Sequence, residues 1–403
     1  MSRRLAFTFI LTTVLIDAIG IGIIFPVMPD LLEDVTGATL SQAAMWGGVL
    51  TTSFAVMQFL FGPVVGNLSD RFGRRPVLFA SLGVMSVDYV VMGLTGSIWF
   101  LLAARTMAGI AAATHSTANA FVADISEAED RGRNFGLIGA AFGAGFVAGP
   151  LIGGVLAGID TRAPFWAAAA LAAANLIFGL IVLPESLSTD KRRPFTLARA
   201  NPLSSFAAIR RLPGLRRLLL VMFVYAVTFN VWPAVWSFYG QAAFGWDAWW
   251  IGISLAVFGV AMAVSQATMV APMIRAFGEG RTALIGMFGE IGTYLFYALV
   301  TSGFWALVLT PLTAVGSVAM PALQAMMSQA TPEDQQGELQ GINTSLNALA
   351  MILSPLVMTW IFGVFTAPGA PVRMPGAPFL LSGILMVAAV AIFVARPRAA
   401  AAA

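Results

Sequence analysis

Twelve apolar runs, each about as long as a membrane-spanning helix, are the feature that most restricts what this chain can fold into. A helix needs about 20 residues to cross the hydrocarbon core of a bilayer. The runs are bounded by Gly, Pro or charged residues and lie at 5–27, 42–65, 76–95, 97–122, 134–158, 164–183, 216–238, 248–273, 282–301, 303–328, 339–365 and 378–395. The pattern predicts an all-α membrane protein with twelve spans.

Composition agrees with this prediction. Of the 403 residues, 59% are hydrophobic and 10% are charged, whereas soluble domains carry about 25% charged residues. Most of the outer surface must therefore face lipid, which excludes a secreted protein, a soluble enzyme on one anchor and a nucleic-acid binder. The chain has no cysteine and one histidine, so disulfides, thiolate metal sites and histidine-rich metal centres are excluded. We expect no resident metal or cofactor.

The twelve runs form two groups of six, separated by the longest polar stretch. Residues 184–215 contain four prolines and six basic residues, a composition typical of a linker. We therefore expect a six-helix bundle over 1–183, a linker over 184–215 and a second six-helix bundle over 216–403. We refer to the two bundles as the first half and the second half, and we number the spans 1 to 12.

Basic residues predict which side of the membrane each connection faces, because Lys and Arg concentrate in cytoplasmic loops. With a cytoplasmic N-terminus, only Arg162 and Arg373 fall on the opposite side. The cytoplasmic side then collects Lys191, Arg192, Arg193, Arg199, Arg210 and Arg211 of the linker, and Arg3, Arg4, Arg71, Arg74, Arg75, Arg131, Arg133, Arg216, Arg217, Arg275, Arg281, Arg396 and Arg398. We expect a multi-pass protein of the inner (cytoplasmic) membrane with both termini in the cytoplasm.

The loop between spans 2 and 3 carries the most specific motif in the chain. Residues 66–75 read GNLSDRFGRR, and we call them the gate loop. Its glycines permit a tight turn, and its acid can pair with the arginines or cap a helix N-terminus. Such a cluster can lock the two halves together in one state and release them in another; a signal for topology alone leaves the acid and the glycines unexplained. The candidate gating residues are Gly66, Asp70, Arg71, Gly73, Arg74 and Arg75, with Asp124 near the end of span 4.

A degenerate copy of this loop stands at the matching place in the second half. Residues 274–281 read IRAFGEGR, so that Phe72-Gly73 recurs 205 residues later as Phe277-Gly278. Internal repetition of this kind is typical of secondary transporters, whose sites lie near the bilayer midplane between repeats.

The gate loop resembles the signature of the major facilitator superfamily. Residues 17–29 (DAIGIGIIFPVMP) resemble the span-1 motif of its twelve-span drug:H⁺ antiporters, and residues 139–154 resemble the span-5 motif of exporters. Shorter segments resemble the tetracycline/H⁺ antiporters in particular, namely Val87-Asp88-Tyr89, Phe142-Gly143, Trp246-Asp247, residues 321–324 and residues 336–341. The likeness is collinear from about residue 5 to residue 365. It implies a fold of two pseudo-symmetric six-helix bundles.

Glycines give span 5 a meaning of its own. They recur at 139, 143, 145, 149 and 153 and would let another helix approach closely, and Pro150 permits a bend. We count Gly143, Gly149 and Pro150 as gating candidates at a pivot between the halves; ordinary close packing is the alternative. The export direction follows from the resemblance, not from the glycines.

Four charged residues fall well inside spans: Asp17, Asp88, Arg105 and Glu290. Each costs about 2.5–3.5 kcal/mol at the midplane on insertion scales, so they are expected to be functional or mutually paired. A carboxyl group in such a place can hold or release a proton near neutral pH. Arg105 could pin Asp17 or Asp88 in a fixed ion pair, whereas Glu290 has no basic residue nearby in its own half. We therefore expect Glu290 to couple protons, with Asp17 as the competing candidate.

The chain departs from the tetracycline pattern in three places. Where the resembling family normally has Asp in span 9, this chain has Glu290, and where it often has His in span 8, four residues before Gln266, this chain has Met262. The only histidine is His115 in span 4, which is either a proton-coupling residue that titrates in the working range or a satisfied buried donor. The family's Gln-x-Pro of span 7 is replaced around Asn230 and Trp232, which puts the substrate in doubt and not the mechanism.

Polar and aromatic side chains within spans are expected to line the substrate path, because they are costly against lipid. The aromatic residues of span 7 would suit a flat, conjugated guest, although interfacial anchoring is an equal alternative. The predicted substrate-binding residues are Gln58, His115, Asn119, Asn230, Trp232, Trp236, Gln266, Glu290, Gln324, Asn343 and Asn347.

These features predict a proton-driven exporter of a flat, amphiphilic drug, most simply a tetracycline chelated with a divalent cation, which works as a monomer in the bilayer. The alternatives are a multidrug or metabolite:H⁺ antiporter, an import carrier or a signalling protein on the same scaffold, and an embedded enzyme. The enzyme is disfavoured because no nucleophile–base pair, phosphate loop or metal cluster stands out in the sequence.

Overall fold

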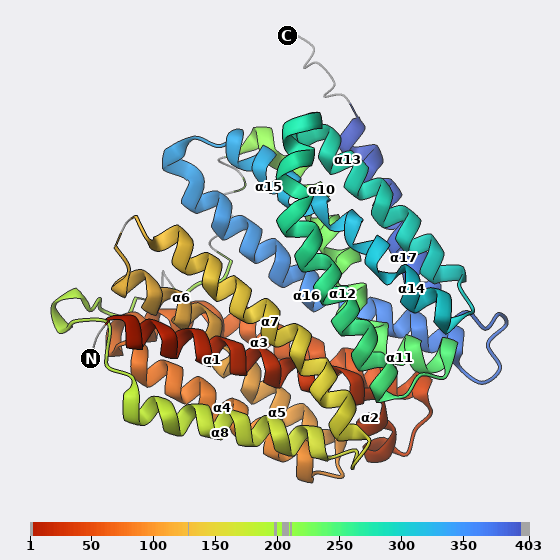
Figure 1. The fold of residues 1–403 in the computed structure, drawn as a ribbon, viewed down its shortest axis with the longest axis horizontal. Coiled ribbons are helices and arrows are strands. Elements are labelled where there is room, and N and C mark those ends of the chain that lie inside the picture. The colour runs from red at the N-terminus through yellow and green to blue at the C-terminus, as the bar shows by residue number, and fades with distance from the viewer. Residues whose placement is uncertain (1–2, 128, 197–199, 204–208, 210–211, 396–403) are drawn as a thin grey trace, which may run out of the picture.

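The computed structural model describes residues 3–127, 129–196, 200–203, 209 and 212–395, and Figure 1 shows them as long helices packed side by side. Twelve segments are helical, long and apolar enough to cross a membrane, and each coincides with one predicted run. No strand occurs in the described ranges. The predicted all-α fold with twelve spans is confirmed. Arg199, Arg210, Arg211, Arg396 and Arg398 lie outside the described residues.

The first half is built from spans 1 to 6. Its elements are α1 (Arg3–Ile24), η1 (Phe25–Val27), α2 (Met28–Thr36), α3 (Leu40–Phe72), α4 (Arg74–Leu94), α5 (Ile98–Ala111), α6 (Thr114–Ile125), α7 (Arg131–Ala157) and α8 (Ala163–Val182).

The second half follows the linker, which holds the 3-10 turns η2 (Thr189–Lys191) and η4 (Pro213–Leu215). Its elements are α10 (Arg216–Phe229), α11 (Val231–Phe244), α12 (Ala248–Thr268), α13 (Val270–Leu299), α14 (Gly303–Thr313), η5 (Ala314–Val318), α15 (Ala319–Gln329), η6 (Glu333–Gln335), α16 (Gln336–Thr366) and α17 (Ala377–Val394).

Four spans are interrupted, and they occupy matching places in the two halves. Span 1 breaks at η1 around Pro26, span 7 at Asn230, and span 10 at η5, which follows Pro311. Proline explains such breaks because it lacks an N–H and clashes with the preceding turn. Span 4 breaks without a proline at Ala112, whose backbone has φ −71° and ψ 67°. Its freed carbonyl accepts a hydrogen bond from Gln58 Nε2 at 3.4 Å.

The gate loop and its copy share one backbone conformation. Gly73 has φ 111° and ψ 163°, and Gly278 has φ 75° and ψ 165°, a left-handed region that favours glycine. The copy differs from the expectation in one respect, because the sequence predicts a loop over 274–281, whereas the helical segment runs up to Phe277 and is broken only at Gly278. The repeat is thus a repeat of structure.

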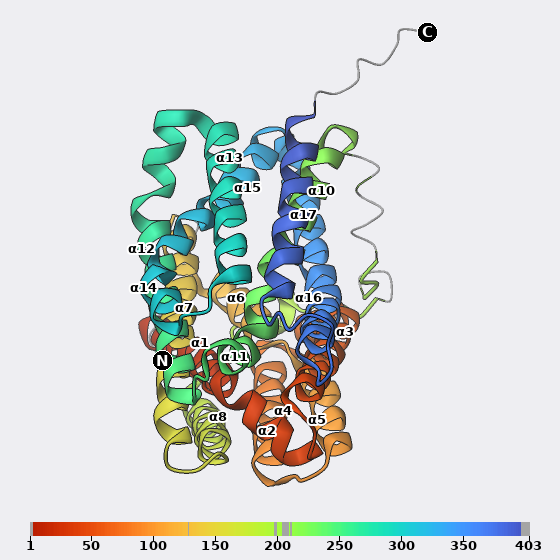
Figure 2. The same ribbon diagram turned by 90° about the vertical axis from the view of Figure 1, so that its right-hand side faces the viewer.

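The two halves touch toward one end of the molecule. Figure 1 shows the bundles meeting near α2 and α11 and diverging toward the chain termini, and Figure 2 shows them stacked one above the other. Two pairs of helices form the junction, α3 with α16 and α7 with α12. The hydrogen bonds between the halves include Gln241 Nε2 to Asp30 Oδ1 at 2.7 Å and Ser237 Oγ to the Phe25 carbonyl at 2.7 Å. Among the described residues, the side-chain hydrogen bonds between the halves all lie toward the α2/α11 end.

Candidate functional site

An ion pair occupies the interior of the first half. Arg105 on α5 forms a salt bridge with Asp88 on α4, and its Nε donates to Asp88 Oδ1 at 3.1 Å. The Asp88 side chain is 1% exposed and that of Arg105 is 14% exposed. The Arg105 Cζ also lies 5.5 Å from the ring centroid of Phe54. Of the two partners that the sequence left open for Arg105, the structure selects Asp88.

Asp17 on α1 has a different environment. It is half-buried and forms no salt bridge within the described ranges. It interacts electrostatically with Tyr89 on α4, which is 2% exposed. The Tyr89 phenol fills the space beside Gly20, where a Cβ would lie 3.2 Å from the hydroxyl oxygen. Asp17 is therefore a carboxylate next to a tyrosine, with Arg105 committed elsewhere.

Glu290 is the buried acid of the second half. It lies on α13, is 3% exposed, and accepts a hydrogen bond at 3.4 Å from the hydroxyl of Tyr225 on α10. Tyr294, one turn further along α13, is buried beside it. On the other side Glu290 packs against η5, because a Cβ on Gly316 would lie 2.8 Å from the carboxyl carbon. Within the described residues Glu290 has no basic partner, and two tyrosines lie beside it.

Matching tyrosines thus accompany the acids of the two halves. Tyr89 and Tyr294 are 205 residues apart, the same spacing as the two Phe-Gly pairs. The hydroxyls of both are buried, and neither makes a hydrogen bond of good geometry with another protein atom. A buried hydroxyl without a partner is costly, so each is a donor available to a neighbouring carboxylate or to a water. Tyr225 and Tyr294 were not among the predicted site residues, although Tyr294 lies one helical turn after Glu290.

The predicted lining residues divide by exposure. His115, at the start of α6, is exposed, and its ring meets that of Phe142 on α7 edge to face at 5.4 Å between centroids. Gln266 and Gln324 are exposed as well, whereas Asn343 is buried, and Gln58, Asn119, Asn230 and Asn347 are half-buried.

Some of these amides already have backbone partners. The side-chain nitrogen of Asn230 donates to the Ala226 carbonyl at 2.7 Å, and that of Asn347 donates to the Asn343 carbonyl at 2.9 Å. Because these side-chain nitrogens already donate to the backbone of their own span, the side-chain oxygens of Asn230 and Asn347 remain as hydrogen-bond acceptors for a substrate.

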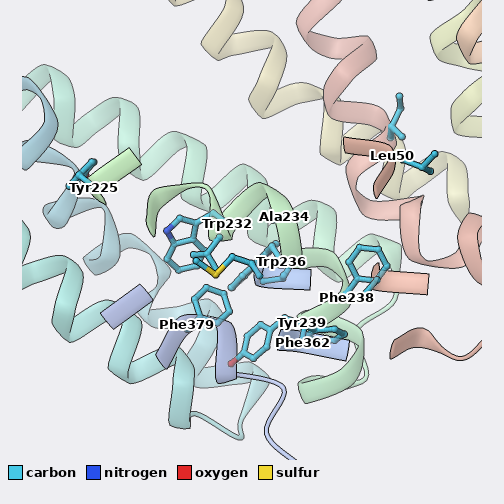
Figure 3. Packing of buried hydrophobic residues seen from close by; sticks show 14 of the residues in the cluster. Leu50, Tyr225, Trp232, Ala234, Trp236, Phe238, Tyr239, Phe362 and Phe379 are labelled. Carbon is cyan, nitrogen blue, oxygen red and sulfur yellow. The ribbon is translucent and has the colours of Figure 1, made fainter. Parts of the chain in front are cut away.

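Trp232 and Trp236 lie elsewhere than the sequence analysis expects. They are 8% and 4% exposed and belong to a cluster of aromatic rings inside the second half, where both pack against Tyr297. Figure 3 shows them beside Phe379. Trp236 Nε1 donates to Ser254 Oγ at 2.9 Å, so its one polar atom is satisfied within the bundle. In this conformation the two side chains are core residues and not lining residues, because they face the α13/α17 side of their helix.

The gate loop is tied together by one arginine. Arg74 at the start of α4 donates to Asp70 Oδ1 at 2.6 Å and to Asp124 Oδ2 at 3.1 Å. These bonds join the ends of spans 2, 3 and 4. Arg71 is exposed and stacks over Phe72, and Arg75 donates to the Leu180 carbonyl at 2.8 Å.

Glu185 completes this cluster, and the sequence analysis missed it. Its carboxylate accepts from the backbone N–H groups of Arg74 at 2.8 Å and Arg75 at 3.2 Å, so that it caps the N-terminus of α4 from the far end of span 6. The carboxylate occupies the place that a Cβ of Gly73 would take. The only sequence signal is an acid directly after Pro184, because the groups that it caps lie 110 residues earlier.

The glycines of span 5 serve different helices. Gly149 packs on α1, where a Cβ would lie 2.7 Å from the Gly22 Cα atom, and Gly154 packs on α12, where a Cβ would lie 2.8 Å from the Ala248 carbonyl oxygen. Pro150 fits against Gly22 as well. Gly66 and Gly143 have open space around their Cα atoms, so close helix approach does not explain them.

Comparison with known proteins agrees with this architecture. Residues 10–310 and 217–403 match the model of the Major Facilitator Superfamily. The tetracycline resistance protein, class C, of Escherichia coli is 44% identical over 362 residues, covering 90% of this chain and 91% of that protein. The class B protein of Escherichia coli is 34% identical over 354 residues, covering 87% of each. The crystal structure of the human organic anion transporter MFSD10 (TETRAN) superposes with a TM-score of 0.69 at 26% identity, over 98% of this chain and all of that chain. The chain therefore belongs to the Major Facilitator Superfamily and is a membrane transporter.

Proposed function

We propose that this transporter exports tetracycline, chelated with a divalent cation, in exchange for protons. The observation that carries the proposal is the 44% identity, over nine-tenths of both chains, to a tetracycline resistance protein. Buried or half-buried acids in both halves supply groups that can take up protons, namely Asp17, Asp88 and Glu290. The cation travels as part of the substrate, and the protein acts as a monomer in the inner membrane.

The orientation follows from the basic residues, which place both termini in the cytoplasm. The α2/α11 end then faces the outside, and the observed conformation is closed outside and open toward the cytoplasm. Tetracycline would enter between the halves from the cytoplasm, past His115, Gln266 and Gln324, which are exposed in this conformation. Export requires the halves to separate at the α2/α11 end and to close at the opposite, cytoplasmic end. The hydrogen bond between Gln241 and Asp30 must therefore break in each transport cycle.

We assign proton coupling to Glu290 rather than to Asp88. A permanent ion pair holds its carboxylate in the charged state, and Asp88 is paired with Arg105. Among the described residues, the groups that hydrogen-bond to Glu290 are neutral tyrosines. Protonating its carboxyl group therefore leaves no partner cation unpaired, whereas protonating Asp88 would leave Arg105 without its counter-charge. Its contact with Gly316 links that state to the interrupted span 10.

The test measures proton movement in inside-out vesicles when tetracycline and Mg²⁺ are added. Parent protein is expected to release protons from the vesicle lumen and accumulate the drug. Glu290→Gln, which mimics the protonated acid, is expected to insert and fold but to lose proton-coupled accumulation. Glu290→Asp is the matched control, which keeps the charge, moves it back by one methylene and is expected to retain transport.

Two outcomes would contradict the proposal. Proton release with other drugs but never with tetracycline would make the protein an antiporter of another substrate class. Full coupling in Glu290→Gln together with its loss in Asp17→Asn would move the proton site to the first half.

A further inference from the structure

The contacts between α7 and α12 define a register that can be followed along both helices. Gly154 lies against Ala248, Gly252 against the Pro150 carbonyl, and Gly259 against the Val147 side chain. As the chain advances along α12 it retreats along α7, so the two helices are antiparallel. These contacts belong to the end at which the halves touch.

Span 8 continues beyond α12 in the same direction. The backbone of Met269 is helical, with φ −104° and ψ −38°, and the N–H of Met273 bonds to the Met269 carbonyl at 3.0 Å. The helix therefore reaches Phe277 before Gly278 breaks it. Because both helices rise by about 1.5 Å per residue, continuing the register places Arg275 opposite the N-terminal end of α7, which begins at Arg131.

Opposite charges stand at these two places. Arg275 is exposed, and its Nε donates to the Ala271 carbonyl of its own helix at 3.3 Å. Glu129 is exposed, and Asp130 is bridged at 3.3 Å to Arg133, whose side chain is 71% exposed. The hydrogen bond of Arg275 and the salt bridge of Asp130 both stay within their own half, and the halves diverge at this end (Figure 1).

We propose that Arg275 is a further gating residue, which contacts Glu129 and Asp130 when the halves close at the cytoplasmic end, opposite the α2/α11 end. The inference rests on the proposed alternation of the two halves. Arg275 stands 205 residues after Asp70, at the equivalent position of the gate-loop copy, and it carries the opposite charge. The two ends of the repeat thus contribute latches of opposite sign.

A simpler explanation exists for each charge taken alone. A cation near the end of a helix and an anion near its start both complement the helix dipole. That explanation predicts no coupling between Arg275 and Asp130, whereas the latch does, so the two are separable by experiment.

The first experiment uses the absence of cysteine from the chain. Asp130→Cys and Arg275→Cys are introduced together, and their cross-linking by a short thiol reagent is measured in membranes. Gly48→Trp serves to force the outside end apart, because a Cβ there would already lie 3.0 Å from the Pro355 carbonyl oxygen. Cross-linking is expected to rise severalfold in the Gly48→Trp background, and an unchanged yield would overturn the proposal. Gly47→Trp, which would meet the Phe238 ring, replaces it if Gly48→Trp does not insert.

The second experiment tests the charges. Arg275→Glu and Asp130→Arg are each expected to reduce transport by about two- to fivefold, the range of an exposed ion pair, and the double exchange is expected to restore most of the loss. Arg281→Glu is the matched control, because Arg281 lies beyond Gly278 and off the register, and it is expected to have little effect. If the two losses in transport simply add in the double exchange, the charges do not interact, and the helix-dipole explanation would replace the latch.

Cross-linking requires no substrate, so it separates this inference from the proposed function. A rise in cross-linking yield without tetracycline transport would support the contact between Arg275 and Asp130 and reject tetracycline as the substrate. Normal tetracycline transport without a rise would reject the latch alone.

Discussion

The Asp88–Arg105 pair gives the most direct test of how the acids divide their roles. The Asp88 side chain is 1% exposed and that of Arg105 is 14% exposed, so removing one partner leaves a buried charge without compensation. Breaking such a pair costs about 3–5 kcal/mol. Because Arg105 retains some exposure, we expect Asp88→Asn to cost about 3 kcal/mol and Arg105→Gln to cost slightly more, since it strands the more deeply buried charge.

The double variant Asp88→Asn with Arg105→Gln removes both charges and leaves two amides that can hydrogen-bond. We expect its free energy of unfolding to lie within about 1.5 kcal/mol of the parent value, because replacing a buried pair as a whole is often close to neutral. The assay is unfolding of the purified protein in mixed micelles, followed by helix content, with all four proteins compared under one condition. Proton release with tetracycline is measured in vesicles for the same set.

If the pair is structural, the double variant keeps proton coupling even where the single variants are unstable. A double variant that is as unstable as the sum of the two single variants would show that the charges do not compensate each other. A stable double variant that transports without protons would make Asp88 a proton carrier and refute the assignment to Glu290.

Four further variants test the gate and the site. Asp70→Asn is expected to abolish transport while membrane insertion, checked by fractionation, stays normal, because insertion depends on the arginines. Glu185→Ala leaves the first turn of α4 uncapped and is expected to cost about 1 kcal/mol of unfolding free energy, with a larger relative loss in transport rate; full transport would show that the cap is dispensable. Gly316→Ala places a methyl group 2.8 Å from the carboxyl carbon of Glu290 and is expected to lower proton-coupled uptake in vesicles without preventing insertion. His115→Gln is expected to shift the pH optimum of transport and not to abolish it, and an unchanged pH profile would make the histidine structural.

The twelve spans were predictable because each is an apolar run bounded by charge, Gly or Pro. Interruptions of spans 1 and 10 are signalled by Pro26 and Pro311. The interruption at Ala112 carries no such signal, since alanine is the best helix former and the group that bonds to the freed carbonyl is Gln58 of another span. Breaks that depend on a distant partner are invisible to local patterns.

Pairing of charges was only partly predictable. The sequence limits Arg105 to two partners, and the choice of Asp88 depends on how α4 and α5 pack. Trp232 and Trp236 were assigned to the substrate path because their type suits a flat guest, but residue type does not say which face of a helix turns inward. Glu185 was missed for a related reason, because a helix N-terminus can be capped from any distance along the chain.

The attachment of the linker to the gate loop has a consequence for how the polypeptide could be divided. Besides the Glu185 cap, the Arg193 N–H bonds to the Asp70 carbonyl at 3.1 Å, and Asn67 Nδ2 donates to the Thr196 carbonyl at 2.8 Å. The first part of the linker is therefore attached to the first bundle, and we expect the chain to divide more cleanly after Thr196 than at 183. If the gene were split after Thr196, the first fragment would keep the linker residues that bond to its gate loop. A split at 183 would place those residues on the second fragment, separate from the loop that they contact.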